Sequence, residues 1–442
     1  FLPQRRDFSM QTRREFLLTA AGAALAVSAP IFVRAANNAT HAPTQATAIT
    51  QVFGDGVKLM AIALTYPHTI QNSALNAQDF SVAGRTISKV FTAQAISLTP
   101  SEAGQFVIVQ LAETDANTSL QEDVYEGDPE AAKPQMQGGK PNWVAGQKMK
   151  KTIRFKDASA TLTTNGNTLH TTAITNLIAD SFRQAEFQDP QTGKTLKYNL
   201  FIPNNTTQPL PLVLFMHDAG ITSEQTRATL FQGLGAIIWA DPAEQAKRPC
   251  YVLAPQYDEI IADDDWRTSK YLETTIHLIQ KLIREHKIDP KRLYATGQSG
   301  GCMTATAMNI KYPDFFAASY LVAGKWGADL VAPMAKNKVW WMASEDDLGA
   351  FPSFNAITER LQQQGVKISR AVWDGKWNAD QYRFAYDDLT AERAQMYYTV
   401  FVKDGVFRPT DSRQGASGHR NTWRIAYSIE PIREWLFAQK KG

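Results

Sequence analysis

The residues best suited to carry out chemistry lie in the run Gly297-Gln298-Ser299-Gly300-Gly301. A short apolar run of β type precedes it, and residues 302–308 indicate a helix that ends before a proline. Strand, tight turn and helix form the context of a G-x-S-x-G nucleophile elbow, in which the serine takes strained backbone angles and the glycines avoid collisions. The run therefore predicts Ser299 as a nucleophile lifted clear of a sheet.

A serine nucleophile needs a histidine base, and with this kind of elbow the acid and then the histidine follow the serine along the chain. The sequence has seven histidines, and only His419 lies beyond Ser299. It ends the run Gly415-Ala416-Ser417-Gly418-His419, which predicts a flexible loop before the closing segment 423–437. A loop there would let the ring reach the serine, so His419 is the predicted base; the alternative is an ordinary surface histidine.

The acid that orients this histidine should follow a strand between the serine and the histidine. Residues 338–343 predict a buried strand, and Ser344-Glu345-Asp346-Asp347 comes directly after it. Asp346 is the first choice, Asp347 the second and Glu345 the third. Acids without a preceding strand, such as Asp314, are interpreted as surface charges.

Two backbone amides should stabilise the oxyanion that such a nucleophile generates. One belongs to Gly300, the residue after the serine. The other should follow the apolar strand 212–216, in the turn His217-Asp218-Ala219-Gly220, where Asp218 and Ala219 remain alternatives. His217 itself is interpreted as structural, because it precedes the serine in the chain.

The elements that must position these residues begin near residue 173. Apolar strands alternate with helices there, and one helix shows a stripe of Leu272, Ile276, Ile279 and Ile283. Such strands predict an α/β fold with a doubly wound, mostly parallel sheet that is covered on both faces. The predicted strands are 212–216, 251–254, 293–296, 319–323, 339–343 and 366–373.

Residues 48–172 predict a different, all-β domain. Strand-like runs flank Gly54-Asp55-Gly56, a hairpin signal, and further strands are predicted at 85–92, 106–111 and 152–155. Several short strands without a long helix favour a small immunoglobulin-like sandwich. Between residues 48 and 157 the only histidine is His68, there is no cysteine, and the acids lack metal-ligand spacing, so we expect no catalytic group from this domain. Its exposed strand edges can support a homo-oligomer.

The first residues predict an export address. Thr12-Arg13-Arg14-Glu15-Phe16-Leu17-Leu18 resembles a twin-arginine signal, and the uncharged stretch after it ends at the small-residue cleavage site Val33-Arg34-Ala35. The predicted division is therefore a signal at 1–35, a polar linker at 36–47, the β domain at 48–172 and the α/β domain at 173–442. A periplasmic or secreted protein is expected, with no stable membrane anchor after signal removal.

Composition limits the partners further. The net charge is +3, and the signal carries an excess of arginine, so the remainder is near neutral and nucleic acid is not an expected partner. The two cysteines, Cys250 and Cys302, do not have the spacing of a metal site and are interpreted as buried free thiols, with a disulfide as the alternative. No metal and no cofactor are predicted.

Several stretches together indicate a family. Residues 198–203, 253–256, 288–294, 312–318 and 418–423, with Trp266 and the serine elbow, resemble bacterial secreted esterases of the α/β-hydrolase superfamily. The nearest types are polyhydroxybutyrate-depolymerase-like and prolyl-oligopeptidase-like esterases, and the β domain resembles the immunoglobulin-like domain that precedes some of them. The resemblance covers residues 198–439 and implies an α/β-hydrolase fold with a Ser-Asp-His triad.

Two departures from that family are visible. The elbow continues as Gly300-Gly301-Cys302 where the family often has Met-Gly-Gly, and residues 374–417 form a longer segment than a minimal hydrolase needs. That segment is rich in aromatic residues, which are interpreted as packing or, alternatively, as a wall of the substrate pocket. Trp266 and Trp377 are the predicted pocket residues. The aromatic residues are Trp377, Tyr382, Phe384, Tyr386, Tyr397 and Tyr398.

The leading interpretation is an exported serine carboxylesterase that acts on a small-molecule or polymeric ester through an acyl-enzyme. A serine peptidase is the enzymatic alternative, because the same triad cleaves amides; the small first domain favours the ester, since related peptidases carry a large propeller. A non-catalytic exported binding protein is the third hypothesis. The order of Ser299, an acid and His419 weighs against it.

Overall fold

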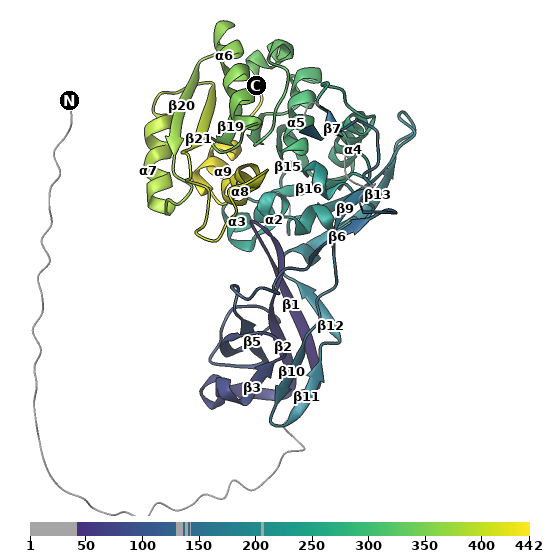
Figure 1. Cartoon of the computed structure of the whole chain (residues 1–442), viewed down its shortest axis with the longest axis vertical. Coiled ribbons are helices and arrows are strands. Elements are labelled where there is room, and N and C mark those ends of the chain that lie inside the picture. Colours follow the sequence, from purple (N-terminus) through teal and green to yellow (C-terminus); the bar gives the residue numbers. More distant parts are fainter. Residues whose placement is uncertain (1–41, 130–135, 138–139, 142, 205–206) are drawn as a thin grey trace, which may run out of the picture. The chain divides into compact units, whose positions relative to one another are not determined.

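The chain forms a β-rich part that is followed by an α/β part (Figure 1). The computed structural model describes residues 42–129, 136–137, 140–141, 143–204 and 207–442. The predicted export signal therefore lies outside the described residues. Residues from Pro43 onward form one compact unit.

The β-rich part consists of two sheets with a shared core. The five-stranded sheet has the order β12-β1-β2-β5-β4 and the three-stranded sheet the order β11-β10-β3. The predicted hairpin is confirmed, since β1 and β2 pair antiparallel around a turn at Gly54 and Asp55. The strands are β1 (Gln45–Phe53), β2 (Gly56–Gln71), β3 (Phe80–Val82), β4 (Ile87–Ala93), β5 (Ala103–Leu111), β10 (Thr161–Thr164), β11 (Asn167–His170) and β12 (Ala173–Asn176).

The last of these strands extends the β-rich part beyond its expected end at residue 172. β12 pairs in parallel with β1, with Ala173 opposite Thr47. Two short ribbons lie in the connection between β5 and β10. They are formed by β6 (Gln121–Tyr125) with β9 (Lys151–Phe155) and by β7 (Met136–Gln137) with β8 (Lys140–Pro141).

One nine-stranded sheet organises the α/β part. Its order is β13-β14-β16-β15-β17-β18-β19-β21-β20; the first three strands pair antiparallel and the rest parallel. The central strands are buried along nearly their whole length, as expected for a sheet covered on both faces. The strands are β13 (Phe182–Gln188), β14 (Thr195–Phe201), β15 (Leu210–Met216), β16 (Tyr251–Gln256), β17 (Ile288–Gln298), β18 (Ala318–Val322), β19 (Val339–Ser344), β20 (Ile368–Trp373) and β21 (Met396–Phe401).

Helices follow most of these strands, as the alternating pattern predicts. The apolar stripe of α4 buries Leu272, Ile276 and Ile279, with Ile283 at its edge. The helices are α1 (Ala228–Phe231), α2 (Leu234–Ala240), α3 (Pro242–Lys247), α4 (Tyr271–Glu285), α5 (Gly300–Lys311), α6 (Ala350–Gln363), α7 (Ala379–Thr390), α8 (Ser417–Ala426) and α9 (Glu430–Phe437). Short 3₁₀ helices are η1 (Asn72–Ala74), η2 (Ala77–Asp79), η3 (Ala179–Ser181), η4 (Ala219–Ile221), η5 (Ala328–Leu330) and η6 (Ala332–Lys336).

The prediction that the last strand is 366–373 is wrong. β21 follows it and inserts between β19 and β20, so β20 becomes the edge of the sheet. The segment between them contains α7, whose start is fixed by a capping box of Asn378 and Gln381. Tyr382, Tyr397 and Tyr398 are buried, as the packing interpretation expected.

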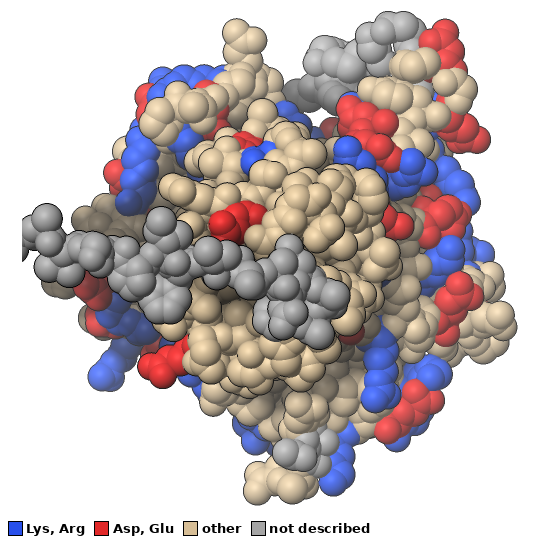
Figure 2. Space-filling model, turned by 90° about the horizontal axis from the view of Figure 1, so that it is seen from below, with Lys and Arg blue, Asp and Glu red and all other residues tan. Residues whose placement is uncertain are grey.

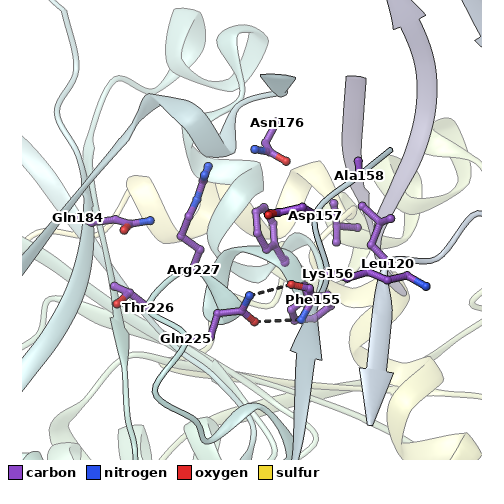
Figure 3. Close-up of a pocket in the computed structure, with 12 residues that line it drawn as sticks. Leu120, Phe155, Lys156, Asp157, Ala158, Asn176, Gln184, Gln225, Thr226 and Arg227 are labelled. Atoms are coloured by element: carbon purple, nitrogen blue, oxygen red, sulfur yellow. Dashed lines mark hydrogen bonds between the residues drawn. The ribbon is translucent and has the colours of Figure 1, made fainter. Parts of the chain in front are cut away.

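The turn of the first hairpin touches the α/β part directly. A side-chain carbon at Gly54 would lie 2.2 Å from the carbonyl oxygen of Arg424, so the hairpin lies against α8. The Asp55 carboxylate accepts a hydrogen bond from Arg408 at 2.9 Å. A second contact is made by Gln225, whose side-chain amide pairs with both backbone groups of Phe155 at 3.0 and 2.8 Å (Figure 3). This pair borders a cavity of about 230 Å³ whose walls come from both parts.

The surface carries both signs of charge. On the face seen in Figure 2, lysine and arginine side chains are interspersed with aspartate and glutamate. Among the residues that the structure describes, no helix has both the length and the apolar character needed to cross a bilayer.

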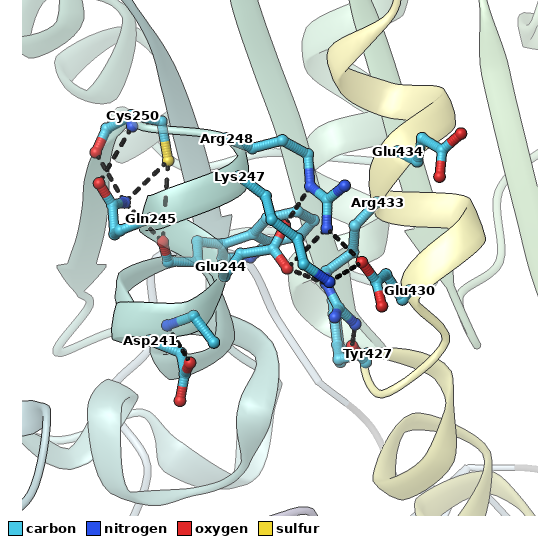
Figure 4. A network of polar contacts seen from close by, with 12 residues as sticks. Asp241, Glu244, Gln245, Lys247, Arg248, Cys250, Tyr427, Glu430, Arg433 and Glu434 are labelled. Carbon is cyan, nitrogen blue, oxygen red and sulfur yellow. Dashed lines mark hydrogen bonds and ion pairs between the residues drawn. The ribbon is translucent and has the colours of Figure 1, made fainter. Parts of the chain in front are cut away.

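A buried charge network joins α3 to α9 (Figure 4). Glu244 receives hydrogen bonds from Arg248 at 2.5 and 2.9 Å and from Arg433 at 3.1 Å. Glu244 and Arg433 are 4% and 6% exposed, so each charge depends on its partners rather than on water. Glu430 extends the network toward solvent through Lys247 and Arg248.

We predict that Glu244→Gln lowers the free energy of unfolding by about 3 kcal/mol, because it leaves the buried Arg433 guanidinium without a counter-charge. Denaturant titration at neutral pH measures this. The matched variant Glu430→Gln, at the partly exposed end of the network, should cost less than about 1 kcal/mol. Equal losses in the two variants would contradict the assignment of Glu244 as the buried centre.

Candidate active site

Ser299 lies at the sharp turn between β17 and α5. Its backbone angles are φ 52° and ψ −117°, in the left-handed half of φ space that a residue with a side chain rarely adopts. A side-chain carbon at Gly297 would lie 2.5 Å from the carbonyl carbon of Gly301, and one at Gly301 would lie 2.0 Å from the Met216 oxygen. The glycines therefore permit the turn, as the elbow pattern requires. Gln298, the residue between, is buried.

The structure brings His419 to Ser299. Its Nε2 atom lies 2.8 Å from Ser299 Oγ, and its Nδ1 atom lies 2.5 Å from Asp347 Oδ2. The expectation of a flexible loop is wrong, because His419 lies in the first turn of α8. Gly418 explains how that helix comes so close to the acid loop: a side-chain carbon there would lie 2.4 Å from the Asp346 carbonyl oxygen. The Trp423 ring meets His419 edge-on at 4.7 Å.

Asp346, the first choice for the acid, does not contact His419; the residue that does is Asp347. After β19 the chain turns, with the Asp347 amide bonded to the Ser344 carbonyl. This turn directs Asp346 Oδ2 to the amide of Asp404 at 2.8 Å. Glu345 accepts from the amide of Lys403 at 2.6 Å, so both neighbours hold the segment after β21. The choice of Asp346 placed the end of the strand one residue early.

The two carboxyls differ in electrostatics as well as in position. Burial acts to raise the pKa of Asp347, but the hydrogen bond and charge of His419 and the amides of Ala350 and Gly349 outweigh it, so the pKa lies below its ordinary value. Those amides bond Asp347 Oδ1 at 3.0 and 3.1 Å and leave Oδ2 for the histidine. For Asp346, burial raises the pKa. Of the two carboxyls, Asp347 has the lowered pKa and makes the hydrogen bond to the imidazole.

Two backbone amides lie beside the serine. A side-chain carbon at Gly300 would lie 3.2 Å from the Ala219 nitrogen, so the amides of Gly300 and Ala219 are neighbours. Neither donates to an acceptor in the described part of the chain. Of the two alternatives, Ala219 is the one whose nitrogen lies against Gly300. The Asp218 side chain helps to form the turn. Its carboxylate accepts from Gly220 N at 2.9 Å and from Gln298 Nε2 at 3.1 Å.

The hydrogen bond between Asp218 and Gln298 is a contact of the candidate site that sequence reasoning missed. It ties the turn after β15 to the residue before the serine, and Gln298 also bonds Gln232 at 3.1 Å. The position of Gln298 in the elbow was the available signal, but its partners are far away in the chain. His217 has both ring nitrogens engaged, Nδ1 with the Asp218 carbonyl at 2.8 Å and Nε2 with the Tyr257 amide at 2.9 Å. Its complete burial lowers its pKa, which fits the structural interpretation.

The two predicted pocket tryptophans lie in different places. The Trp266 ring packs against the Trp326 ring, with 5.5 Å between their centroids. Trp326 lies in the segment after β18, and Val322, the last residue of β18, accepts a hydrogen bond from the Ser299 amide. The φ angle of Trp266, 63°, is strained. Trp377 instead packs on Trp373 and Tyr382, which agrees with a packing role.

The remaining candidates for chemistry are inert in this fold. Cys250 and Cys302 are both free and fully buried, and burial raises the pKa of each thiol. In the described ranges of the chain, no group of three or more histidine, cysteine, aspartate or glutamate residues could hold a metal ion.

Comparison with known proteins agrees with this architecture. Residues 45–170 match the family model described as the esterase Ig-like N-terminal domain. A solved thermostable esterase is 24% identical, covers 90% of this chain and all of its own, and superposes with a TM-score of 0.71. With the sheet order above, this confirms the predicted fold class, an α/β-hydrolase sheet preceded by an immunoglobulin-like sandwich. No curated protein matches the chain.

Other solved structures are more distant. A feruloyl esterase module from Clostridium thermocellum is 12% identical over 57% of this chain and 86% of its own, with a TM-score of 0.39. A puromycin-hydrolyzing peptidase from Mycobacterium tuberculosis is 15% identical over 62% of this chain and 42% of its own, also with a TM-score of 0.39. Scores this low carry no inference about the chain.

We predict that Asp347→Asn removes the downfield proton resonance of the His419 Nδ1–H group, because an amide cannot hold the imidazole as the ionised carboxylate does. Proton NMR of the folded protein in water measures this without any substrate. Asp346→Asn is the matched control and should leave the resonance in place. Loss of the resonance in Asp346→Asn alone would overturn the assignment of Asp347.

Proposed function

We propose that the protein is a serine carboxylesterase. The observation that carries the proposal is the continuous chain of hydrogen bonds from Ser299 Oγ through His419 to Asp347, with two neighbouring amides next to the serine. The acid fixes the histidine, the histidine can take the serine proton, and the amides have no other task among the described residues. The family model for an esterase Ig-like domain supports an ester as substrate.

The proposed reaction has two halves. His419 Nε2 removes the proton of Ser299 as the oxygen attacks the ester carbonyl, and the negative charge that forms is stabilised by the amides of Gly300 and Ala219. Asp347 holds the Nδ1 proton and stabilises the imidazolium, which then protonates the departing alcohol. A water activated by the same histidine attacks the acyl-enzyme, releases the acid and restores Ser299.

Position and strain fit these roles. Ser299 is held in a strained conformation at the start of α5, where the helix dipole adds to the two amides. Trp266 lies in the segment after β16 and Trp326 in the segment after β18, and their packed rings are proposed as part of the pocket wall beside the serine. Export through the twin-arginine route and release of residues 1–35 remain part of the proposal and rest on the sequence alone. The proposal that the protein self-associates through the first domain likewise rests on the sequence alone.

We predict that Ser299→Ala lowers kcat on p-nitrophenyl butyrate by about 10⁴-fold or more, because the triad acts as a unit. The initial rate of nitrophenol release at saturating ester measures this, with Ser412→Ala, an exposed serine before α8, as the matched control. A fluorophosphonate should label the wild type once, at Ser299, as read by peptide mass spectrometry.

Three results would reject the proposal in different ways. Full ester hydrolysis by Ser299→Ala would remove the triad from the reaction. Hydrolysis of a peptide anilide without hydrolysis of an ester of the same acyl group would make the protein a peptidase. Absence of turnover and of labelling in the folded wild type would favour a non-catalytic binding protein.

A further inference from the structure

A small cavity lies beside the turn that carries the proposed oxyanion amides. It measures about 20 Å³. Its walls come from the turn after β15, the segment after β16 and the first turn of α5. The residues that matter here are Ala219, Thr222, Glu259, Gly300 and Thr304.

One carboxylate oxygen of Glu259, a residue that lines this cavity, lacks a hydrogen-bond donor among the described protein atoms. The residue is 6% exposed, and its Oε2 atom accepts a hydrogen bond from Lys194 Nζ at 2.7 Å. Its Oε1 atom is buried and has no hydrogen-bond partner among the described protein atoms. A buried carboxylate oxygen without a donor loses its hydration and gains nothing in return, so native proteins rarely leave one unsatisfied.

Two residues that carry hydroxyl groups, Thr222 and Thr304, line the same cavity as Glu259. Thr304 Oγ1 donates to the Gly300 carbonyl at 2.9 Å and keeps its lone pairs for a donor. The Thr222 hydroxyl is on a residue that is 2% exposed and makes no hydrogen bond within the described residues. Neither hydroxyl is bonded to Glu259. The cavity therefore offers a strong acceptor and two hydroxyls but nothing that joins them.

The volume decides what can join them. A bound water needs a cavity volume of about 10–15 Å³ and two to four polar partners. An acyl chain or a sugar needs a far larger volume. We propose that the cavity binds a single water molecule, which donates one hydrogen bond to Glu259 Oε1 and exchanges others with the Thr222 and Thr304 hydroxyls. Its consequence is that Glu259 is a positioning residue for the turn that presents the Ala219 amide.

The water would add a link to a turn that other contacts already hold, among them the hydrogen bond from Gln256 Nε2 to the Ile221 carbonyl at 2.8 Å. Asp218 already ties it to Gln298 and to Gly220, on the side of the serine. Thr222 ends the turn, and the water would link it to the first turn of α5 through Thr304. Oxyanion donors act by being fixed before the reaction, so a change in this link should affect the transition state more than the bound ester. This role rests on the proposed function, whereas the water site itself does not.

The first test is a crystal structure of the full mature protein at a resolution that shows ordered solvent. We expect one water within hydrogen-bonding distance of Glu259 Oε1, at the position between Thr222 and Thr304. A cavity without density in the wild type would overturn the proposal whatever the kinetics show. Hydrolysis that survives Ser299→Ala would instead overturn the proposed function and leave the water site standing.

The second test is kinetic. We expect Glu259→Leu to lower kcat on p-nitrophenyl butyrate about tenfold, less than the ~10²-fold or greater loss of a whole oxyanion donor, with KM within about twofold. If this variant does not fold, Thr222→Val serves in its place with about a threefold loss, and Thr222→Ser, which keeps the hydroxyl, should recover it. A kcat unchanged in both Glu259→Leu and Thr222→Val would overturn the positioning role.

Two controls separate the water from the ion pair and from general damage. Lys194→Met removes the cation and leaves the carboxylate in the cavity, so it should lower Tm while kcat stays within about twofold. Glu186→Leu changes an exposed glutamate of β13 and should alter neither. If Lys194→Met loses as much kcat as Glu259→Leu, the effect belongs to the ion pair and the proposal fails.

Discussion

The site depends first on how closely the helix after the serine approaches the neighbouring strand. A side-chain carbon at Gly301 would lie 2.0 Å from the Met216 oxygen, so glycine alone lets α5 begin against the end of β15. That approach places the Gly300 amide beside the Ala219 amide. It also requires the left-handed backbone of Ser299, which the buried strands on either side hold in place. One backbone contact thus sets the positions of Ser299 and of the two amides that are proposed as oxyanion donors.

Three adjacent acids after β19 show how local backbone direction assigns different tasks to similar side chains. Asp347 Oδ1 accepts hydrogen bonds from two backbone amides at the start of α6, and its Oδ2 atom contacts His419. The side chains of Glu345 and Asp346 instead accept hydrogen bonds from the backbone amides of Lys403 and Asp404, respectively. The same short run therefore orients the histidine and ties down the segment that leads to α8. Charge alone does not distinguish the three residues, whereas the turn that follows Ser344 does.

The sequence was sufficient where a property is local. The elbow glycines and the buried strands are local patterns, and the structure has the turn and the sheet that they predict. The approach of His419 to Ser299 is not local, and it was predicted because only one histidine follows the serine in the chain. The sequence was insufficient where other partners are far apart in the chain. Asp347 is selected by a turn whose register no periodicity reports, and the bond between Asp218 and Gln298 joins residues from two strands. β21 was missed because its aromatic residues were counted as part of a long connection, although Met396–Phe401 has strand composition.

The hairpin of the immunoglobulin-like part limits how freely that part can be exchanged. Gly54 lies against the Arg424 backbone of α8, and Asp55 pairs with Arg408 in the segment before that helix. A sandwich of the same fold taken from another protein would need a residue without a side chain at the first position and a carboxylate at the second. Otherwise the helix that carries His419 would acquire a different neighbour. The two parts are therefore matched to each other at this contact.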